Sequence, residues 1–106
     1  MTIVLRPITI WALEELADRN EQVRLWLSDG SSGEVSSFDE VVSQVFESDV
    51  DRAMGRNEFP EPLLQLFIRL RTLIQKVPSN LAPRDLIGHP LMDAVRDTAQ
   101  QIRNML

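Results

Sequence analysis

Acidic side chains are the groups of this sequence best able to do chemistry, and most of them lie between residues 29 and 61. This stretch holds nine carboxylates against two arginines. Carboxylates serve as general acids and bases, as ligands of hard cations, or as charges that attract a basic partner. Four of them lie on or just after one predicted helix, whose apolar face is formed by other residues: Asp39, Glu47, Asp49 and Asp51. We expect these charges to face water and to contact a partner protein, a basic one in particular.

Catalytic and metal-binding patterns are missing from the acids and from the one histidine. Adjacent carboxylates such as Asp39 and Glu40 point about 100° apart on a helix, so they do not form an acid–base pair by themselves. His89 has no second histidine and no cysteine to complete a transition-metal site. We expect it to cap the last helix or to pack on a loop. The sequence therefore predicts no catalytic residue, no metal and no cofactor, and we interpret the chain as a non-enzyme.

Basic residues follow the acidic stretch. Between residues 62 and 84 there is no acid, and the cations are Arg69, Arg71, Lys76 and Arg84. These side chains are the candidates for an alternative function, a helical regulator that binds nucleic acid through its phosphates. The net charge of −5 makes nucleic acid an unfavourable partner for the chain as a whole. The simpler interpretation is that the cations form the polar edge of a largely buried helix and pair with the acidic segment.

The segment 62–77 is the strongest helix signal in the chain. Its apolar residues recur at spacings of three and four, which places them on one helical face: Leu63, Leu66, Phe67, Leu70, Leu73, Ile74 and Val77. Leu64 and Ile68 add a second apolar strip beside this face. Such a helix needs cover on two sides, so we expect it to be the central element of the domain. A second copy of the chain over Leu64 and Ile68 is the other way to cover it, which makes a homodimer a hypothesis.

Capping signals mark two helices in the first quarter of the chain. Thr9 can cap a helix over residues 8–17. Asp18 and Glu21 resemble a capping box, which predicts a second, short helix through residue 27. A strand over 19–27 stays the alternative, because the apolar residues there also alternate.

Two further helices follow the Ser/Gly-rich loop of residues 28–33. Ser37 and Glu40 form the clearest capping box of the sequence, at the start of an amphipathic helix over 37–47. We expect an interruption of this helix near residues 48 and 49. The last helix is predicted over 90–105, with a proline at its first position.

Together these elements predict a single all-α domain over residues 1–106, with four or five helices packed around 62–77. The hydrophobic share of 43% and the charged share of 25% are those of an ordinary globule, and we expect Trp11 and Trp26 in its core. No apolar run reaches the roughly 18 residues of a transmembrane helix, and no signal-peptide core is visible. The absence of cysteine fits a reducing compartment. We therefore expect a cytoplasmic protein that does not contact a membrane.

The first half of the chain resembles a family of short bacterial proteins. The family pattern is Q-x-x-x-W, then S-F-x-E, then an F-D-D-like pair, and it falls here on Gln22 to Trp26, Ser37 to Glu40, and an interrupted Phe46-Glu47-Ser48-Asp49. The family has no established activity. The resemblance implies a bacterial, cytosolic setting and transfers no catalytic residue.

Composition and charge rank the function classes. Small acidic helical proteins include toxin-neutralising immunity proteins, and complementary charge would speed such an association. We expect first a non-catalytic protein–protein interaction module with an acidic surface, with the immunity type as its specific form. The alternatives are the nucleic-acid-binding regulator and an enzyme of unknown type.

Overall fold

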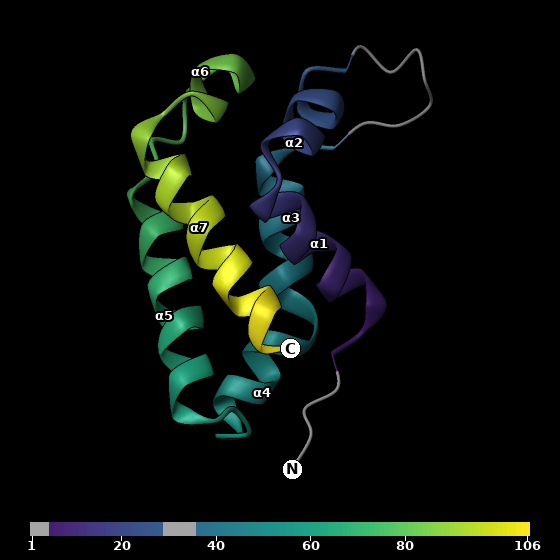
Figure 1. Ribbon diagram of the computed structural model, residues 1–106, viewed down its shortest axis with the longest axis vertical. Helices are drawn as coiled ribbons and strands as arrows, with labels where there is room; N and C mark the ends of the chain where they lie inside the picture. Colours follow the sequence, from purple (N-terminus) through teal and green to yellow (C-terminus); the bar gives the residue numbers. More distant parts are fainter. Residues whose placement is uncertain (1–4, 29–35) are drawn as a thin grey trace.

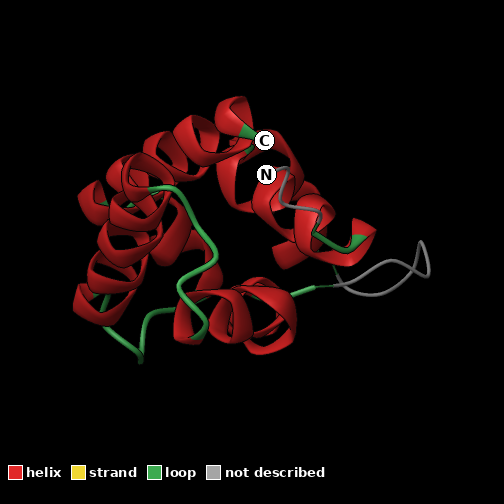
Figure 2. Ribbon diagram, turned by 90° about the horizontal axis from the view of Figure 1, so that it is seen from below, coloured by secondary structure: helices red, strands yellow, loops and turns green. Residues whose placement is uncertain are grey.

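The computed structural model describes residues 5–28 and 36–106, and these residues form helices, turns and loops without any strand (Figures 1 and 2). In chain order the helices are α1 (Pro7–Ala17), α2 (Arg19–Trp26), α3 (Phe38–Val45), α4 (Asp51–Gly55), α5 (Glu61–Lys76), α6 (Pro83–Ile87) and α7 (Pro90–Met105). A π-helical segment, Phe46–Val50, joins α3 to α4. The all-α prediction is confirmed, and the described residues form more helices than the four or five expected.

The helices α1 and α7 form the centre of the bundle. The principal interfaces are those of α1 with α7, α5 with α7, and α1 with α3, so α5 and α3 flank this central pair. In Figure 1, α5 forms the left side of the molecule and α3 lies behind α1. The prediction that helix 62–77 is central is therefore wrong. Its buried side chains, Leu63, Phe67 and Leu70, form one face, while Ile68 on the second strip is 41% exposed. The bundle therefore covers only one side of α5, and the second apolar strip stays partly exposed to water.

Two of the three predicted N-terminal caps are confirmed. The Asp18 carboxylate accepts hydrogen bonds from the backbone N–H groups of Asn20 and Glu21, at 2.9 and 3.3 Å, which settles residues 19–26 as helix rather than strand. The Ser37 hydroxyl accepts from the Glu40 N–H at 3.2 Å. Thr9 does not cap: α1 begins at Pro7, two residues earlier, and Thr9 is buried inside the helix. Proline at a first helical position can start a helix without a side-chain cap.

The helix predicted over 37–47 does not end near residue 48. It passes from α3 through the π-helical segment into α4, where the Asp51 N–H donates to the Phe46 carbonyl five residues back. The expected interruption is thus a change of helical pitch, and residues 38–55 form one rod along the long axis of the molecule (Figure 1). A π segment accommodates one extra residue without breaking the helix.

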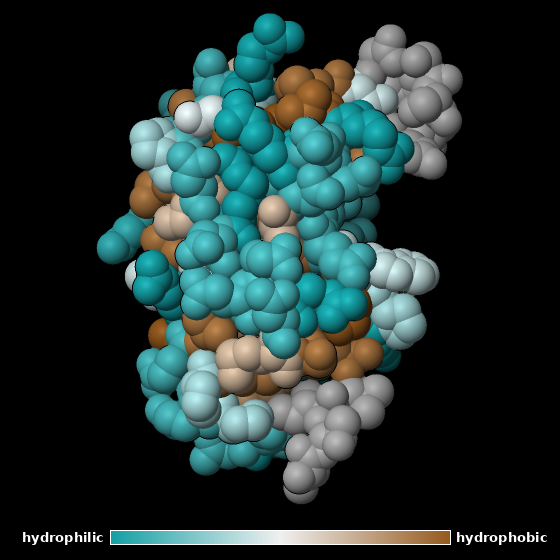
Figure 3. All heavy atoms as spheres, viewed as in Figure 1, coloured by the Kyte–Doolittle hydropathy of each residue, from teal (hydrophilic) through white to brown (hydrophobic). Residues whose placement is uncertain are grey.

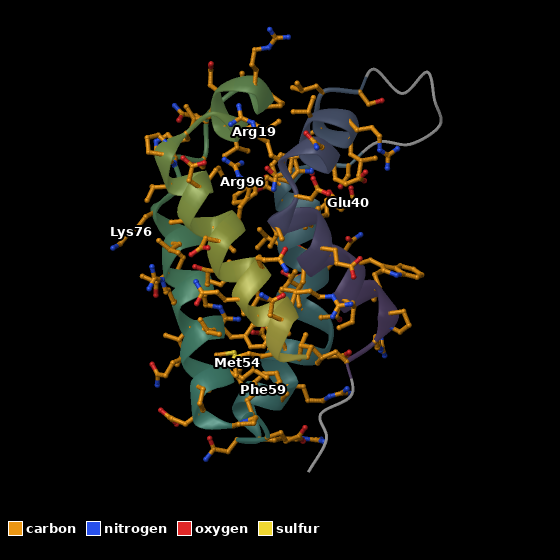
Figure 4. The ribbon with its side chains drawn as sticks, in the orientation of Figure 1. Arg19, Glu40, Met54, Phe59, Lys76 and Arg96 are labelled. Carbon is orange, nitrogen blue, oxygen red and sulfur yellow. The ribbon has the colours of Figure 1, made fainter. Side chains whose placement is uncertain are left out.

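Aromatic rings close the lower end of the bundle. Phe59 stacks on Phe67 with ring centres 4.9 Å apart, and Phe46 meets the edge of Phe67 at 6.4 Å. Met54 and Phe59 lie together below the end of α7 (Figure 4). Phe59 comes from the loop before α5, so burying it fixes where that loop runs.

A buried polar network ties the other end together. The Gln22 side-chain amide donates to the carbonyls of Glu15 and Leu16, at 3.1 and 2.8 Å. Its oxygen accepts from Arg96 Nη1 at 2.9 Å, and the same nitrogen donates to the Ile87 carbonyl at 3.1 Å. Arg96 reaches from α7 toward α2 (Figure 4). Four helices, α1, α2, α6 and α7, are therefore joined through two side chains.

The outer face of α7 is hydrophilic. Figure 3 shows teal residues along the middle of this face and brown, hydrophobic ones toward both ends. Within residues 5–28 and 36–106, no helix has the length and apolar character that crossing a bilayer requires.

Candidate partner-binding groove

An apolar hollow of the described surface lies between α3 and the C-terminal half of α5. It has a volume of about 570 Å³ and reaches over the loop that leads to α6. Its apolar lining comes from five separate segments: Trp26, Phe38, Val42, Ile74, Val77, Leu81 and Leu86. Volumes of this size are typical of sites that hold a ligand or a few large side chains.

A smaller hollow of about 230 Å³ continues it toward α4. The two share Val42, Ser43, Ile74 and Gln75, so they form one continuous depression. We call the whole the α3–α5 groove, with a wide end at Trp26 and a narrow end whose additional lining residues are Phe46, Glu47, Asp51 and Arg71. The groove exists because α3 packs on α1 and α5 on α7, which leaves the two flanking helices without a principal interface of their own.

Three of the four predicted partner-binding acids line this groove. Asp39 lies at the wide end, and Glu47 and Asp51 lie at the narrow end. All three side chains are exposed. The sequence suggested a charged helix surface, and the structure adds an apolar floor between the charges.

Asp49 does not belong to this surface, and the expectation that it faces water is wrong. Its residue is 5% exposed. The carboxylate accepts the Arg6 backbone N–H at 2.5 Å and the Thr9 hydroxyl at 3.5 Å. It also pairs with the side chains of Arg6 and Arg52, at 3.4 and 3.5 Å. Asp49 thus binds the N-terminus of α1, where the helix dipole favours a negative charge.

One of the four basic candidates is engaged within the chain. Arg71 forms an ion pair with Asp51, and its guanidinium carbon lies 4.5 Å from the centre of the Phe46 ring. This pair confirms that the basic segment meets the acidic one. Arg69, Lys76 and Arg84 are exposed, and Lys76 points outward from the flank of α5 (Figure 4).

Two aromatic residues of the family-like pattern, Trp26 and Phe38, line the wide end of the groove. Trp26 Nε1 and the Ser36 hydroxyl both donate to the same Glu15 oxygen, each at 2.8 Å. The Trp26 ring meets the edge of Phe38 at 5.8 Å. Because its nitrogen is held by Glu15, the indole presents a fixed apolar surface. Trp26 and Phe38 therefore shape one pocket, whereas Phe46 lines the narrow end of the groove.

Sequence reasoning missed the α5 and α6 side of the groove. Ile74 belongs to a stripe assigned to the core, and Leu81 and Leu86 lie in a segment without strong periodicity. The one sequence signal for a pocket here was the occurrence of Trp26 and Phe38 in the same family-like pattern, and it concerns only the α2 and α3 side. Trp26 is buried as expected, whereas Trp11 is 66% exposed and the expectation of a core position for it is wrong.

Two polar features of the described surface lie outside the groove. A hollow of about 580 Å³ lies between the ends of α1 and α7, where Arg103 and Glu14 pair at 2.9 Å. On α2, a hydrogen bond from Arg24 lowers the pKa of Glu21 below its ordinary value, opposed by a small desolvation effect. This exposed ion pair lies on one face of α2, outside the groove.

His89 caps α7, one of the two roles expected for it. Its Nδ1 accepts the Leu91 N–H at 3.1 Å. Among residues 5–28 and 36–106, no three His, Asp or Glu side chains are grouped as metal ligands.

Comparison of the chain with protein-family models, with curated proteins and with solved structures returns no match, so the groove is interpreted from its own chemistry.

Proposed function

We propose that this protein is a non-catalytic interaction module, which binds a basic segment of a partner protein along the α3–α5 groove. The observation that carries the proposal is the position of Asp39, Glu47 and Asp51 around one apolar floor. Charge alone would steer a partner, and apolar area alone would bind many proteins. Their combination in one groove favours a specific basic partner.

The immunity type is the specific form of this proposal. A toxin-neutralising protein has to recognise a positively charged surface quickly. The acidic rim of the groove, formed by Asp39, Glu47 and Asp51, promotes such recognition. The net charge of −5 and the small helical fold agree with that form. The absence of cysteine supports a cytoplasmic setting for it.

Charge reversal at the groove tests the proposal. The variant Asp39→Lys/Glu47→Lys/Asp51→Lys removes the acidic rim while leaving the buried Asp49 in place. We expect partner proteins captured from the organism of origin to associate at least tenfold more slowly with it, measured at low salt. A matched control, Glu40→Lys/Asp85→Lys/Asp97→Lys, changes the net charge equally at exposed acids outside the groove. Equal loss in both variants would reduce the acidic surface to a general charge effect.

Nucleic acid is the competing partner, and salt dependence distinguishes it. Binding through Arg69, Lys76 and Arg84 would weaken steeply with rising salt and would strengthen when the acidic rim is removed. We expect no binding to duplex DNA at physiological salt. Tight binding that is lost in Arg69→Ala/Lys76→Ala/Arg84→Ala would replace the proposed function with the regulator.

A further inference from the structure

We infer that the occupant of the α3–α5 groove is an amphipathic helix of three to four turns, with large apolar side chains on one face and Lys or Arg near both ends. This inference rests on the proposed function and adds the shape, length and register of the partner segment. It follows from four properties of the groove: its floor, its walls, its length and the placement of its charges.

The floor is built to receive apolar side chains. The wide end is lined by Trp26 and Phe38, which hold each other edge to face, and by Leu81 and Leu86 from the opposite side. The hydrogen bond from Trp26 to Glu15 fixes the indole before any partner arrives. A preformed apolar pocket avoids the ordering cost that a flexible surface would pay on binding.

The walls favour a helix over an extended strand. Both walls are helices that run along the long axis of the molecule (Figure 1). The described residues contain no strand, so no sheet edge is present to bind an extended peptide by strand addition. A third helix laid between α3 and α5 could instead pack its ridges into theirs. Each of the two already packs on one helix of the bundle, α3 on α1 and α5 on α7.

The length of the groove sets the length of the occupant. Thirteen residues separate Phe38 from Asp51 along the rod, which corresponds to about 20 Å of helix or three to four turns. Phe38 and Phe46 are eight residues and about 12 Å apart. A partner helix lying along them would place its apolar side chains at positions i, i+4 and i+7 or i+8.

The charges define the ends of the occupant. Asp39 lies at the wide end, Glu47 and Asp51 at the narrow end, and the only cation in the described lining is Arg71. Arg71 is already paired with Asp51 and lies over Phe46. The chain thus contains one example of how an arginine fits the narrow end, through a carboxylate and an aromatic face together.

A displayed library of helix-forming peptides of about 14 residues, randomised on one face, is the probe for this inference. Selection against the intact protein should enrich apolar residues at i, i+4 and i+7 or i+8, flanked by Lys or Arg. Absence of enrichment, or enrichment of sequences without this spacing, would overturn the inference.

Blocking variants locate the binding site. Gln75 is exposed and lines both hollows, so Gln75→Trp should fill the groove from α5 and weaken a selected peptide at least tenfold. Ser43→Trp should do the same from the facing wall. Gln65→Trp, exposed on the same helix but outside the groove, is the matched control, with less than twofold change expected. Circular dichroism and thermal melts verify that each variant is folded.

Trp26 gives a signal from inside the groove. In the Trp11→Phe background it is the only tryptophan, so peptide binding in the groove should shift its emission. Peptides that bind without this shift, or that bind Gln75→Trp and Ser43→Trp unchanged, would overturn the helix inference.

The two proposals fail in different ways. If charge reversal at the rim slows the native partner while the two blocking variants do not, the acidic surface stands and the helix inference is wrong. If neither set of variants affects the native partner, both are wrong.

Discussion

At the scale of single residues, two neighbouring acids differ in burial and in the groups they bind. Asp51 turns outward to Arg71, while Asp49, two positions earlier, is buried against the start of α1. No property of the two side chains distinguishes them in the sequence. Their positions do, because residues two apart on a helix point about 200° apart and Asp49 lies four residues after the buried Val45. The burial of Asp49 was missed because we expected the helix to be interrupted near residue 48, whereas it continues through the π-helical segment.

Replacing Asp49 tests its structural role. Asp49→Ala leaves the Arg6 N–H without its carboxylate and Arg6 and Arg52 without their partner, so the free energy of unfolding should fall by about 1–3 kcal/mol. Asp51→Ala removes an exposed ion pair and should change it by less than about 1 kcal/mol. Urea denaturation of both variants measures the difference. Equal losses would mean that Asp49 is not a structural carboxylate.

Gln22 is a second residue whose role only the fold discloses. It is fully buried and accepts a hydrogen bond from Arg96, 74 positions away. Gln22→Leu keeps the shape of the side chain but removes a hydrogen-bond partner from two carbonyls and from a guanidinium nitrogen. The free energy of unfolding should therefore fall by about 2 kcal/mol or more. Gln101→Leu, exposed on α7, should stay within about 0.5 kcal/mol. Thermal denaturation compares the two, and a neutral Gln22→Leu would contradict a stabilising network.

At the scale of elements, local signals predicted the helices well. Asp18 and Ser37 cap helices where the sequence placed them, and the long helices at 61–76 and 90–105 lie within a residue of their predicted bounds. The position of each helix in the bundle was harder to predict. The apolar strip of Leu64 and Ile68 suggested a central helix, yet α5 lies on a flank. Periodicity identifies which face is apolar but contains no information on which neighbour covers it.

The buried face of α5 provides a test of its packing. Leu70 is fully buried, so Leu70→Ala should lower the free energy of unfolding by about 2–5 kcal/mol. Leu66→Ala, at a half-buried position of the same helix, should cost less. Chemical denaturation of the two variants checks the order. A cost below about 1 kcal/mol at Leu70 would contradict tight packing of α5 on the bundle.

The start of α3 provides a second test at this scale. Ser37 accepts the Glu40 N–H, and Ser37→Ala should destabilise the protein by about 1 kcal/mol through the lost cap. Ser37→Asp restores an acceptor beside the helix N-terminus and should recover most of the loss. A melt series of the three proteins measures this. Identical melting temperatures would remove the cap from the account of α3.

At the scale of the whole molecule, the groove is the feature that the sequence could not provide. Its wall residues come from α2, α3, α5, α6 and a connecting loop, and they meet only because α3 and α5 pack on different central helices. Three of its acids were predicted from charge and helix position. The apolar floor depends on distances between elements, which no local pattern specifies.

The homodimer hypothesis also belongs to this scale. Leu64 is half-buried, and Ile68 is exposed on the same strip. Two such residues contribute little of the roughly 1,000 Å² that a stable interface buries. We expect light scattering at micromolar concentration to give the mass of one chain, unchanged in Ile68→Glu. A twofold mass that returns to one chain in Ile68→Glu would establish the dimer instead.

The π-helical segment has a genetic consequence. Since Phe46–Val50 holds one residue more than an α-helix would, an in-frame deletion of a single codon there should rewind the rod into a regular α-helix. Because a π turn takes up one residue more than an α turn, α4 should keep nearly its present orientation relative to α3 after the deletion, with Asp51 still beside Arg71. A deletion inside α3 removes no such extra residue and should turn everything after it by about 100°. The segment between Val45 and Asp51 should therefore tolerate the loss of one residue better than α3 does, and a codon-deletion scan would locate the segment without any knowledge of the structure.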